Sequence, residues 1–185
     1  TMQVTALTTE QVAGLGTLQV AALTAAQIGA METADVEILN ATQIAAMTST
    51  QIGGLTTDQF SQFTTEEIAG LTTTQVTGLK AATLNALDAT KLSYVNAAAL
   101  TSTQVSGLTT VQTAALTTEQ VAAIGTRQVA AMTTLQMAAL TTLQMAALGT
   151  LQVAALTVTQ IKSLTEGTIA ALSDEQIGAL SATKI

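Results

Sequence analysis

Large apolar residues recur along this chain with a period of eight, which is neither the period of a strand nor that of one long helix. Each block of eight residues, here called an octad, is numbered from a polar residue at position 1. Position 5 is large and apolar except at Thr113, and position 8 is large and apolar throughout, as in residues 117–124 (TTEQVAAI). Eleven octads fill residues 8–95 and ten fill residues 101–180, so the chain is a tandem repeat array.

Each octad carries the signals that start a new helix. Position 1 is Thr in thirteen of the 21 octads and Gly, Asn, Ser or Asp in six more, all of them residue types preferred at helix N-caps. Position 4 is Gln in sixteen octads, so most contain Thr-x-x-Gln, a capping box. Position 8 of one octad and position 5 of the next are spaced as a hydrophobic staple. The pattern predicts one capped helix of about six residues in each octad.

Two other folds compete with a chain of short helices. In one continuous helix the apolar stripe would rotate by about 80° per octad and would bury nothing consistently. A β-solenoid stays as an alternative, although positions 5 and 8 would face opposite sides of a strand, and Ala, Leu, Gln and Met favour helix. Helices this short are unstable alone. We therefore predict an all-α solenoid, a superhelix with positions 5 and 8 lining its axis and small residues at positions 6 and 7 between turns.

The repeat register breaks once, at the five residues 96–100. The predicted organisation is an octapeptide block at 1–95, the insertion at 96–100 and a second block at 101–185, in one continuous solenoid. The insertion corresponds to an octad without its first three positions, and we expect residues 89–100 to form one longer helix because Asn96 stands where a new cap would come. Broken octads at both ends lead us to expect a segment of a longer array.

The composition excludes several kinds of functional site. The chain has no His and no Cys, so it carries no Ser–His triad, thiol nucleophile or Cys/His zinc site. Five Lys and Arg residues and a net charge of −7 argue against nucleic-acid binding. No apolar stretch is long enough for membrane insertion. We expect a protein that is not an enzyme, with no catalytic residue, no cofactor and no metal.

Acidic residues depart from the repeat in two places. Glu32, Asp35 and Glu37 fall in one octad and could hold calcium, but they lack the spacing of a calcium loop. The favoured interpretation is a solvated octad in which Asp35 replaces the capping Gln. Glu66 and Glu67 could form a pair for acid–base chemistry. For Glu67 the favoured role is that of Gln in the capping box.

Three leucines occupy a position where folding does not explain them. Position 3 lies in the first helical turn, which normally faces solvent and favours Asp or Glu. Leu135, Leu143 and Leu151 hold this position in three consecutive octads. They would ring the solenoid if about three octads complete a turn, and they would form a patch if the winding is slower. We predict them as an interaction surface for another chain, through self-association, or for neighbouring repeats of the parent protein.

The TTxQ[VI]AAL octads resemble the tandem octapeptide blocks of very large secreted or surface proteins of bacteria, which are described as adhesin-like or haemagglutinin-like. The resemblance implies an extracellular or cell-surface stalk or adhesive array. We expect a structural spacer or scaffold without catalysis. The alternative is a repetitive binding surface for a glycan, a protein or ice, or for self-association. The threonines at position 2 that would form an ice-binding lattice are interrupted by other residues, which weakens that case.

Overall fold

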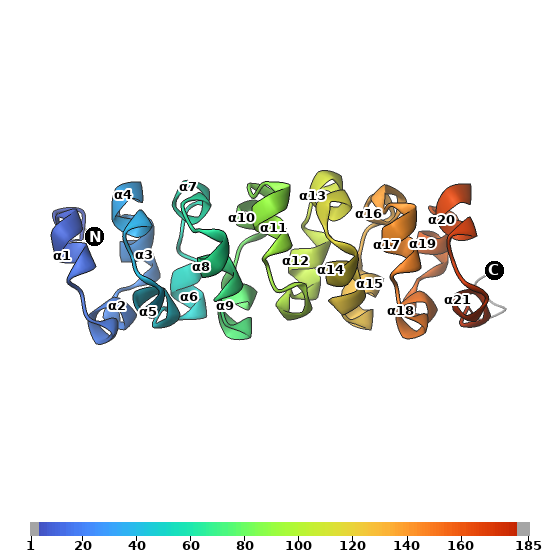
Figure 1. The fold of residues 1–185 in the computed structure, drawn as a ribbon, viewed down its shortest axis with the longest axis horizontal. Coiled ribbons are helices and arrows are strands. Elements are labelled where there is room, and N and C mark those ends of the chain that lie inside the picture. The colour runs from blue at the N-terminus through green and yellow to red at the C-terminus, as the bar shows by residue number, and fades with distance from the viewer. Residues whose placement is uncertain (1–3, 181–185) are drawn as a thin grey trace. The chain divides into compact units, whose positions relative to one another are not determined.

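The computed structural model describes residues 4–180, and all regular structure in that range is helical (Figure 1). The first eleven α-helices are α1 (Thr9–Ala13), α2 (Thr17–Ala22), α3 (Ala25–Gly29), α4 (Thr33–Glu37), α5 (Ala41–Ala45), α6 (Ser49–Ile52), α7 (Thr57–Ser61), α8 (Thr65–Ala69), α9 (Thr73–Gly78), α10 (Ala81–Asn85) and α11 (Ala89–Ser93). The others are η1 (Ala97–Ala99, a 3₁₀ helix), α12 (Ser102–Ser106), α13 (Thr110–Ala115), α14 (Thr118–Ala123), α15 (Thr126–Ala131), α16 (Thr134–Ala139), α17 (Thr142–Ala146), α18 (Thr150–Ala155), α19 (Val158–Lys162), α20 (Glu166–Ala170) and α21 (Asp174–Gly178). None of the helices in residues 4–180 has the length and apolar character that crossing a bilayer requires.

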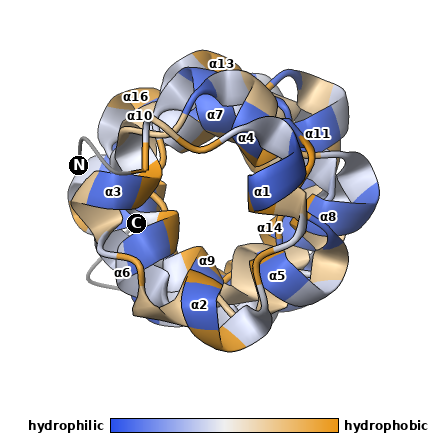
Figure 2. Ribbon diagram, turned by 90° about the vertical axis from the view of Figure 1, so that its left-hand side faces the viewer, coloured by the Kyte–Doolittle hydropathy of each residue, from blue (hydrophilic) through white to orange (hydrophobic). Residues whose placement is uncertain are grey.

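The chain divides after Asn96 into two compact units. Within each unit, every octad forms one α-helix of four to six residues, and helices three apart in sequence pack on each other. In the first unit α1 packs on α4 and α3 packs on α6, whereas in the second α12 packs on α15 and α13 on α16. In the end-on view of Figure 2, α1, α2 and α3 occupy different corners of one turn. The predicted all-α solenoid of very short capped helices is confirmed.

The core of each unit is built from octad positions 5 and 8. Phe60 at position 5 and Phe63 at position 8 are both fully buried, with ring centroids 4.9 Å apart. Met137 and Leu140 occupy the same two positions in the second unit and are buried as well. Burying one such side chain stabilises a fold by about 1.5–3 kcal/mol. This packing between turns sustains helices that would not form in isolation.

The corners between helices need no left-handed residue. At the corners the N–H of position 8 bonds the carbonyl of position 5, as Leu15 does with Val12 at 3.1 Å, except at Ile124, whose N–H bonds the carbonyl of Gln120 at 3.2 Å. The chain then becomes extended and enters the next N-cap, as at Leu79 with φ −61° and ψ 137°. Among residues 4–180 no backbone φ is positive. Position 8 can therefore be a large core residue. Many other helices end with a glycine, because the chain there adopts a left-handed conformation.

The expectation for positions 6 and 7 is met in part. In the column α3, α6 and α9 these positions include Gly29, Gly53, Gly54 and Gly78, and the backbones of successive turns approach closely there. Elsewhere many position-6 residues face solvent, including Ala45, Ala122 and Ala138. Small residues at position 6 thus do not generally fill the contact between turns.

The predicted helix over residues 89–100 is wrong. Helix α11 ends at Ser93, and the N–H of Val95 bonds the carbonyl of Leu92 at 3.0 Å, which is the same corner that closes nearly all the other octads. The insertion then forms η1, in which Ala97 is buried and the N–H of Leu100 bonds the carbonyl of Ala97 at 3.2 Å. The insertion is a shortened octad, as expected, but burial of Val95 and Ala97 imposes a corner where a straight helix would expose one of them.

Candidate functional site

Threonine at position 1 and glutamine at position 4 form reciprocal caps. In α14 the hydroxyl of Thr117 accepts a hydrogen bond from the N–H of Gln120 at 3.1 Å, and the N–H of Thr117 donates to Oε1 of Gln120 at 3.0 Å. The predicted capping box is confirmed in most octads. The position-1 side chain makes no cap bond in five octads, those of Gly16, Glu32, Lys80, Gly125 and Gly149.

The same glutamines also bind the preceding turn of the solenoid. Nε2 of Gln51 donates to the carbonyl of Val20 at 2.7 Å and to the carbonyl of Leu23 at 2.7 Å, which lie 31 and 28 residues earlier. These carbonyls belong to positions 5 and 8 of the octad four places back. The same pair of separations recurs in both units, at Gln43, Gln59, Gln75, Gln136, Gln144, Gln152 and Gln160.

Each bridging amide satisfies polar groups at two helix ends at once. A helix start leaves backbone N–H groups without partners, and a helix end leaves carbonyls without partners. The Gln amide has one acceptor oxygen and two N–H donors, so the cap N–H fixes the position of Oε1 and the two carbonyls fix Nε2. Gln51 is 2% exposed. A buried side chain with all these groups paired joins adjacent turns without leaving an unsatisfied polar atom.

The sequence pattern predicts the cap but not the bond between turns. A capping box accepts Glu as well as Gln, yet Gln fills sixteen octads and Glu only one, at Glu67. Oε2 of Glu67 accepts the N–H of Thr64 at 2.8 Å, which confirms its predicted capping role. A carboxylate has no N–H to donate to the earlier turn. The strong preference for the amide over the acid was the signal of this second role.

Lysine replaces glutamine at position 4 of one octad, where it makes the bond to the preceding turn but does not cap the helix. Nζ of Lys91 donates to the carbonyl of Ser61, 30 residues earlier, and so retains the bond to the preceding turn. Lysine offers no acceptor for the N-cap N–H. Here the carboxylate of Asp88 caps the helix by accepting the N–H of Lys91 at 2.8 Å.

The three predicted interface leucines lie on the surface of the second unit. Leu135, Leu143 and Leu151 are 71%, 72% and 76% exposed. They belong to the consecutive helices α16, α17 and α18, and the main packing contacts join helices three apart, so the leucines lie around the second unit and do not form one patch. Helix α16 packs on α13, which carries the exposed Val111 at the same octad position. The exposed apolar side chains are therefore distributed around the second unit.

The acidic residues singled out by the sequence do not form a common site. Glu32 and Glu37 are exposed, whereas Asp35 is buried at position 4 of its octad. Within residues 4–180 no group of three His, Cys, Asp or Glu side chains is placed to hold a metal ion. The carboxylate of Glu66 is exposed and accepts a hydrogen bond from the hydroxyl of Thr65 at 3.0 Å, while Glu67 caps its helix.

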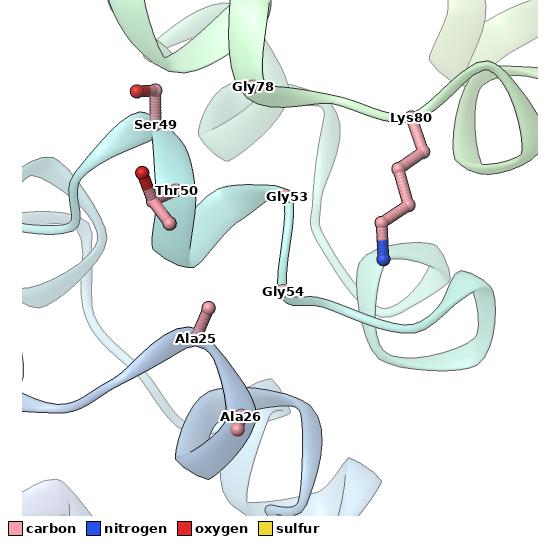
Figure 3. A pocket seen from close by; sticks show the side chains of 8 residues that line it. All are labelled: Ala25, Ala26, Ser49, Thr50, Gly53, Gly54, Gly78 and Lys80. Carbon is pink, nitrogen blue, oxygen red and sulfur yellow. The ribbon is translucent and has the colours of Figure 1, made fainter.

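A surface depression of about 520 Å³ lies over α3, α6 and α9. Its lining residues are Ala25, Ala26, Ser49, Thr50, Gly53, Gly54, Gly78 and Lys80 (Figure 3). A Cβ atom on Gly53 would stand 2.6 Å from the carbonyl oxygen of Gly78, and one on Gly54 would stand 2.5 Å from that of Ala25. The glycines thus permit the close approach of these turns. The polar groups of the depression are two hydroxyls and one amine, with no second titratable group beside Lys80.

Comparison with known proteins identifies the octads as a described repeat. The family model of the ALTTAQ repeat matches residues 1–31, 28–65, 114–142 and 129–166, which together make up more than half of the chain. No curated protein and no solved structure is significantly similar to it. The matched segments include octads of both units.

Proposed function

We propose that this chain, which belongs to the ALTTAQ repeat family, is a structural module whose regular turns act as a spacer or scaffold in a large extracellular or cell-surface protein. The observation that carries the proposal is the glutamine bond between turns, repeated with the same separations of 28 and 31 residues in both units. Such bonds connect each turn only to its neighbour, so stiffness accumulates as octads are added.

A role without catalysis is supported by where the side chains lie. The buried positions of most octads hold apolar residues or glutamines whose amides are used in caps and in bonds between turns. The extracellular setting rests on the resemblance of the octads to blocks of secreted or surface bacterial proteins. The proposal includes no nucleic acid and no cofactor.

The spacer role is tested by measuring distances along one column of helices. Glu10, Ala34, Asp58 and Ala82 are exposed at position 3 of α1, α4, α7 and α10, which pack in sequence. The chain has no Cys, so spin labels can be attached to cysteine pairs 10/34, 10/58 and 10/82. A spacer gives three narrow distance distributions that rise in equal steps. Broad, overlapping distributions would contradict it, and Gln43→Glu with Gln51→Glu provides a variant expected to broaden them.

A second function, a repetitive binding surface, is favoured by the exposed leucines at position 3. Leu135, Leu143 and Leu151 are large apolar side chains open to solvent, and they recur at the same position of three consecutive octads. Because they ring the unit, we propose that they contact another protein or neighbouring repeats of the parent protein at several sides. Binding of a glycan or ice would use the exposed threonines at position 2, such as Thr134 and Thr142. A surface that functions in this way would lose its partner, but not its fold, when the leucines are replaced.

A further inference from the structure

One column of helices in the second unit carries a symmetric pattern of exposed side chains. Helix α15 packs on α18, and α18 packs on α21, so the three follow one another along one side of the unit (Figure 1). Position 3 of their octads holds Arg127, Leu151 and Glu175. All three side chains are exposed. The column thus presents a positive, an apolar and a negative group at equal steps of three octads.

The columns of the other two exposed leucines lack this pattern. Leu135 of α16 lies between Val111 of α13 and Thr159 of α19, which are uncharged. Leu143 of α17 has Glu119 of α14 on one side, and position 3 of α20 on the other side is a glycine. When either column is laid antiparallel on its own copy, no opposite charges meet. For the column of α15, α18 and α21 the same operation places each charge opposite its complement.

A depression of about 350 Å³ lies beside Leu151, where α15 and α18 meet. Its lining includes Ala122, Ile124, Gly125 and Gly149. The two glycines occupy position 1 of their octads, where most octads hold threonine. Because these two side chains are missing, the depression has room for an apolar side chain from outside the unit.

The distribution of charge permits two copies to meet at this place. The chain has a net charge of −7, but residues 128–161 contain no charged residue. Contact between like charges would oppose association elsewhere on an acidic chain. We propose that the column of α15, α18 and α21 binds the same column of a second copy of this chain, antiparallel, in a two-fold symmetric dimer.

The symmetry fixes which side chains meet. Leu151 of each copy lies near the two-fold axis and enters the depression of the other copy, while Arg127 of each copy pairs with Glu175 of the other. The interface is isologous, so association stops at the dimer. A second copy is the occupant that the pattern selects, because the pattern is its own complement. The inference rests on the binding surface proposed above and names its partner, whereas the spacer role is tested separately by the spin-label distances.

Sedimentation tests the central contact. The mass of the wild type is expected to rise with concentration to that of a dimer and no further. Leu151→Glu is expected to associate at least about tenfold more weakly, whereas Leu135→Glu and Leu143→Glu, which lie in the other columns, should associate as the wild type does. Circular dichroism shows whether each variant is folded, and Leu151→Ser replaces Leu151→Glu if that variant is not. A monomeric wild type, a mass above that of a dimer, or an equal loss for all three leucines would overturn the proposal.

Charge reversal tests the antiparallel direction. Arg127→Glu places Glu opposite Glu twice in the dimer, and Glu175→Arg places Arg opposite Arg twice, so each variant is expected to associate at least about tenfold more weakly. A mixture of the two variants restores both ion pairs and is expected to form one-to-one dimers of wild-type affinity. One chain with both substitutions should also dimerise as the wild type does. Single variants that associate normally, or folded variants whose mixture stays monomeric, would contradict this direction.

Filling the depression tests where the leucine goes. Gly149→Thr introduces the residue that most octads have at position 1, so the helix stays capped, but the depression is closed. This variant is expected to keep its melting temperature and to associate more weakly. Gly16→Thr is the matched control, because octads 16–23 and 149–156 are identical in sequence, and it should dimerise as the wild type does. Equal affinities for the two variants would overturn the placement of Leu151 in the depression.

Discussion

The side-chain amide of Gln51 bonds the carbonyl of Val20, 31 residues earlier, while its oxygen accepts the backbone N–H of Thr48 at 2.7 Å. One side chain thus caps the start of its own helix and the end of a helix in the preceding turn. The consequence is that local helix formation and packing between turns depend on the same residue.

Gln51→Glu is expected to destabilise the fold, because the acid keeps the cap but brings a buried carboxylate against two carbonyl oxygens. Leaving buried polar groups unpaired costs about 1–3 kcal/mol for each group. The matched reverse change is Glu67→Gln, which adds donors opposite the carbonyls of Val36 and Leu39 and is expected to stabilise by about 0.5–1.5 kcal/mol. Urea unfolding measures both. Equal and small effects would show that the bonds between turns contribute little.

Thr117→Ala is expected to cost about 0.5–2 kcal/mol, because it removes the side-chain cap of α14. Thr118→Ala changes the neighbouring residue, which lies outside the cap, and is expected to be nearly silent. The two single variants are compared by thermal melting. If they are equally costly, position 1 is not the residue that matters for capping.

Gly53→Ala is expected to destabilise the first unit, since the new Cβ would stand 2.6 Å from the carbonyl oxygen of Gly78 and the turns would have to separate. Gly178 occupies the same octad position in α21, and a Cβ there meets no atom within 4 Å. Gly178→Ala is therefore expected to stabilise by up to about 1 kcal/mol through helix propensity. Melting temperatures that shift in the same direction for both would count against the close approach of α6 and α9.

The stability of the protein is expected to fall in acid through Glu119 and Glu175. Hydrogen bonds hold the pKa of each carboxyl below its ordinary value of 4.5, first from its own backbone N–H and then from the hydroxyls of Thr117 and Thr118 for Glu119, and of Ser173 for Glu175. A carboxyl whose pKa is lowered by folding stabilises the folded state at pH values above its ordinary pKa. This stabilisation is lost as the pH falls through the pKa of the folded state.

We therefore expect the contribution of these two carboxylates to be constant from pH 7 to about pH 5 and to decline below that. Glu119→Gln with Glu175→Gln is the matched variant, because it retains the shape and removes the titration. The difference in melting temperature between wild type and variant should shrink below the ordinary value of 4.5. A difference that grows in acid would reverse the sign of the effect.

Replacing Leu135, Leu143 and Leu151 by Glu is expected to leave the second unit folded, with little change in melting temperature, because all three side chains are exposed. The triple variant should also lose self-association, since these leucines include Leu151, the predicted contact between copies of the chain. It should lose any contact with another protein or with neighbouring repeats. Unfolding would show that the leucines belong to the core, and self-association that survives the replacement would show that the contact between copies lies elsewhere.

The octad by itself determined where the helices begin, how long they are and which apolar positions supply the core. The octad 117–124 shows why. The N-cap, the capping box and the hydrophobic staple are each formed by residues less than eight apart, such as Thr117, Gln120 and Val121. They are therefore visible in the sequence and do not depend on the arrangement of turns. The same local logic failed at residues 89–100. There the burial of Val95 and Ala97, and not the missing cap, decided that the chain turns.

Only the tertiary structure decided the contacts between turns. The angle through which the chain rotates at each corner decides that helices three apart pack together and that Gln51 reaches Val20. The same angle decides that Leu135, Leu143 and Leu151 face different sides. Small differences in corner angle add up from octad to octad, and the residues of one octad do not determine the total rotation. The preference for Gln over Glu at position 4 marked this interaction, but its partners lie 28 and 31 residues away and became known only when the turns were in place.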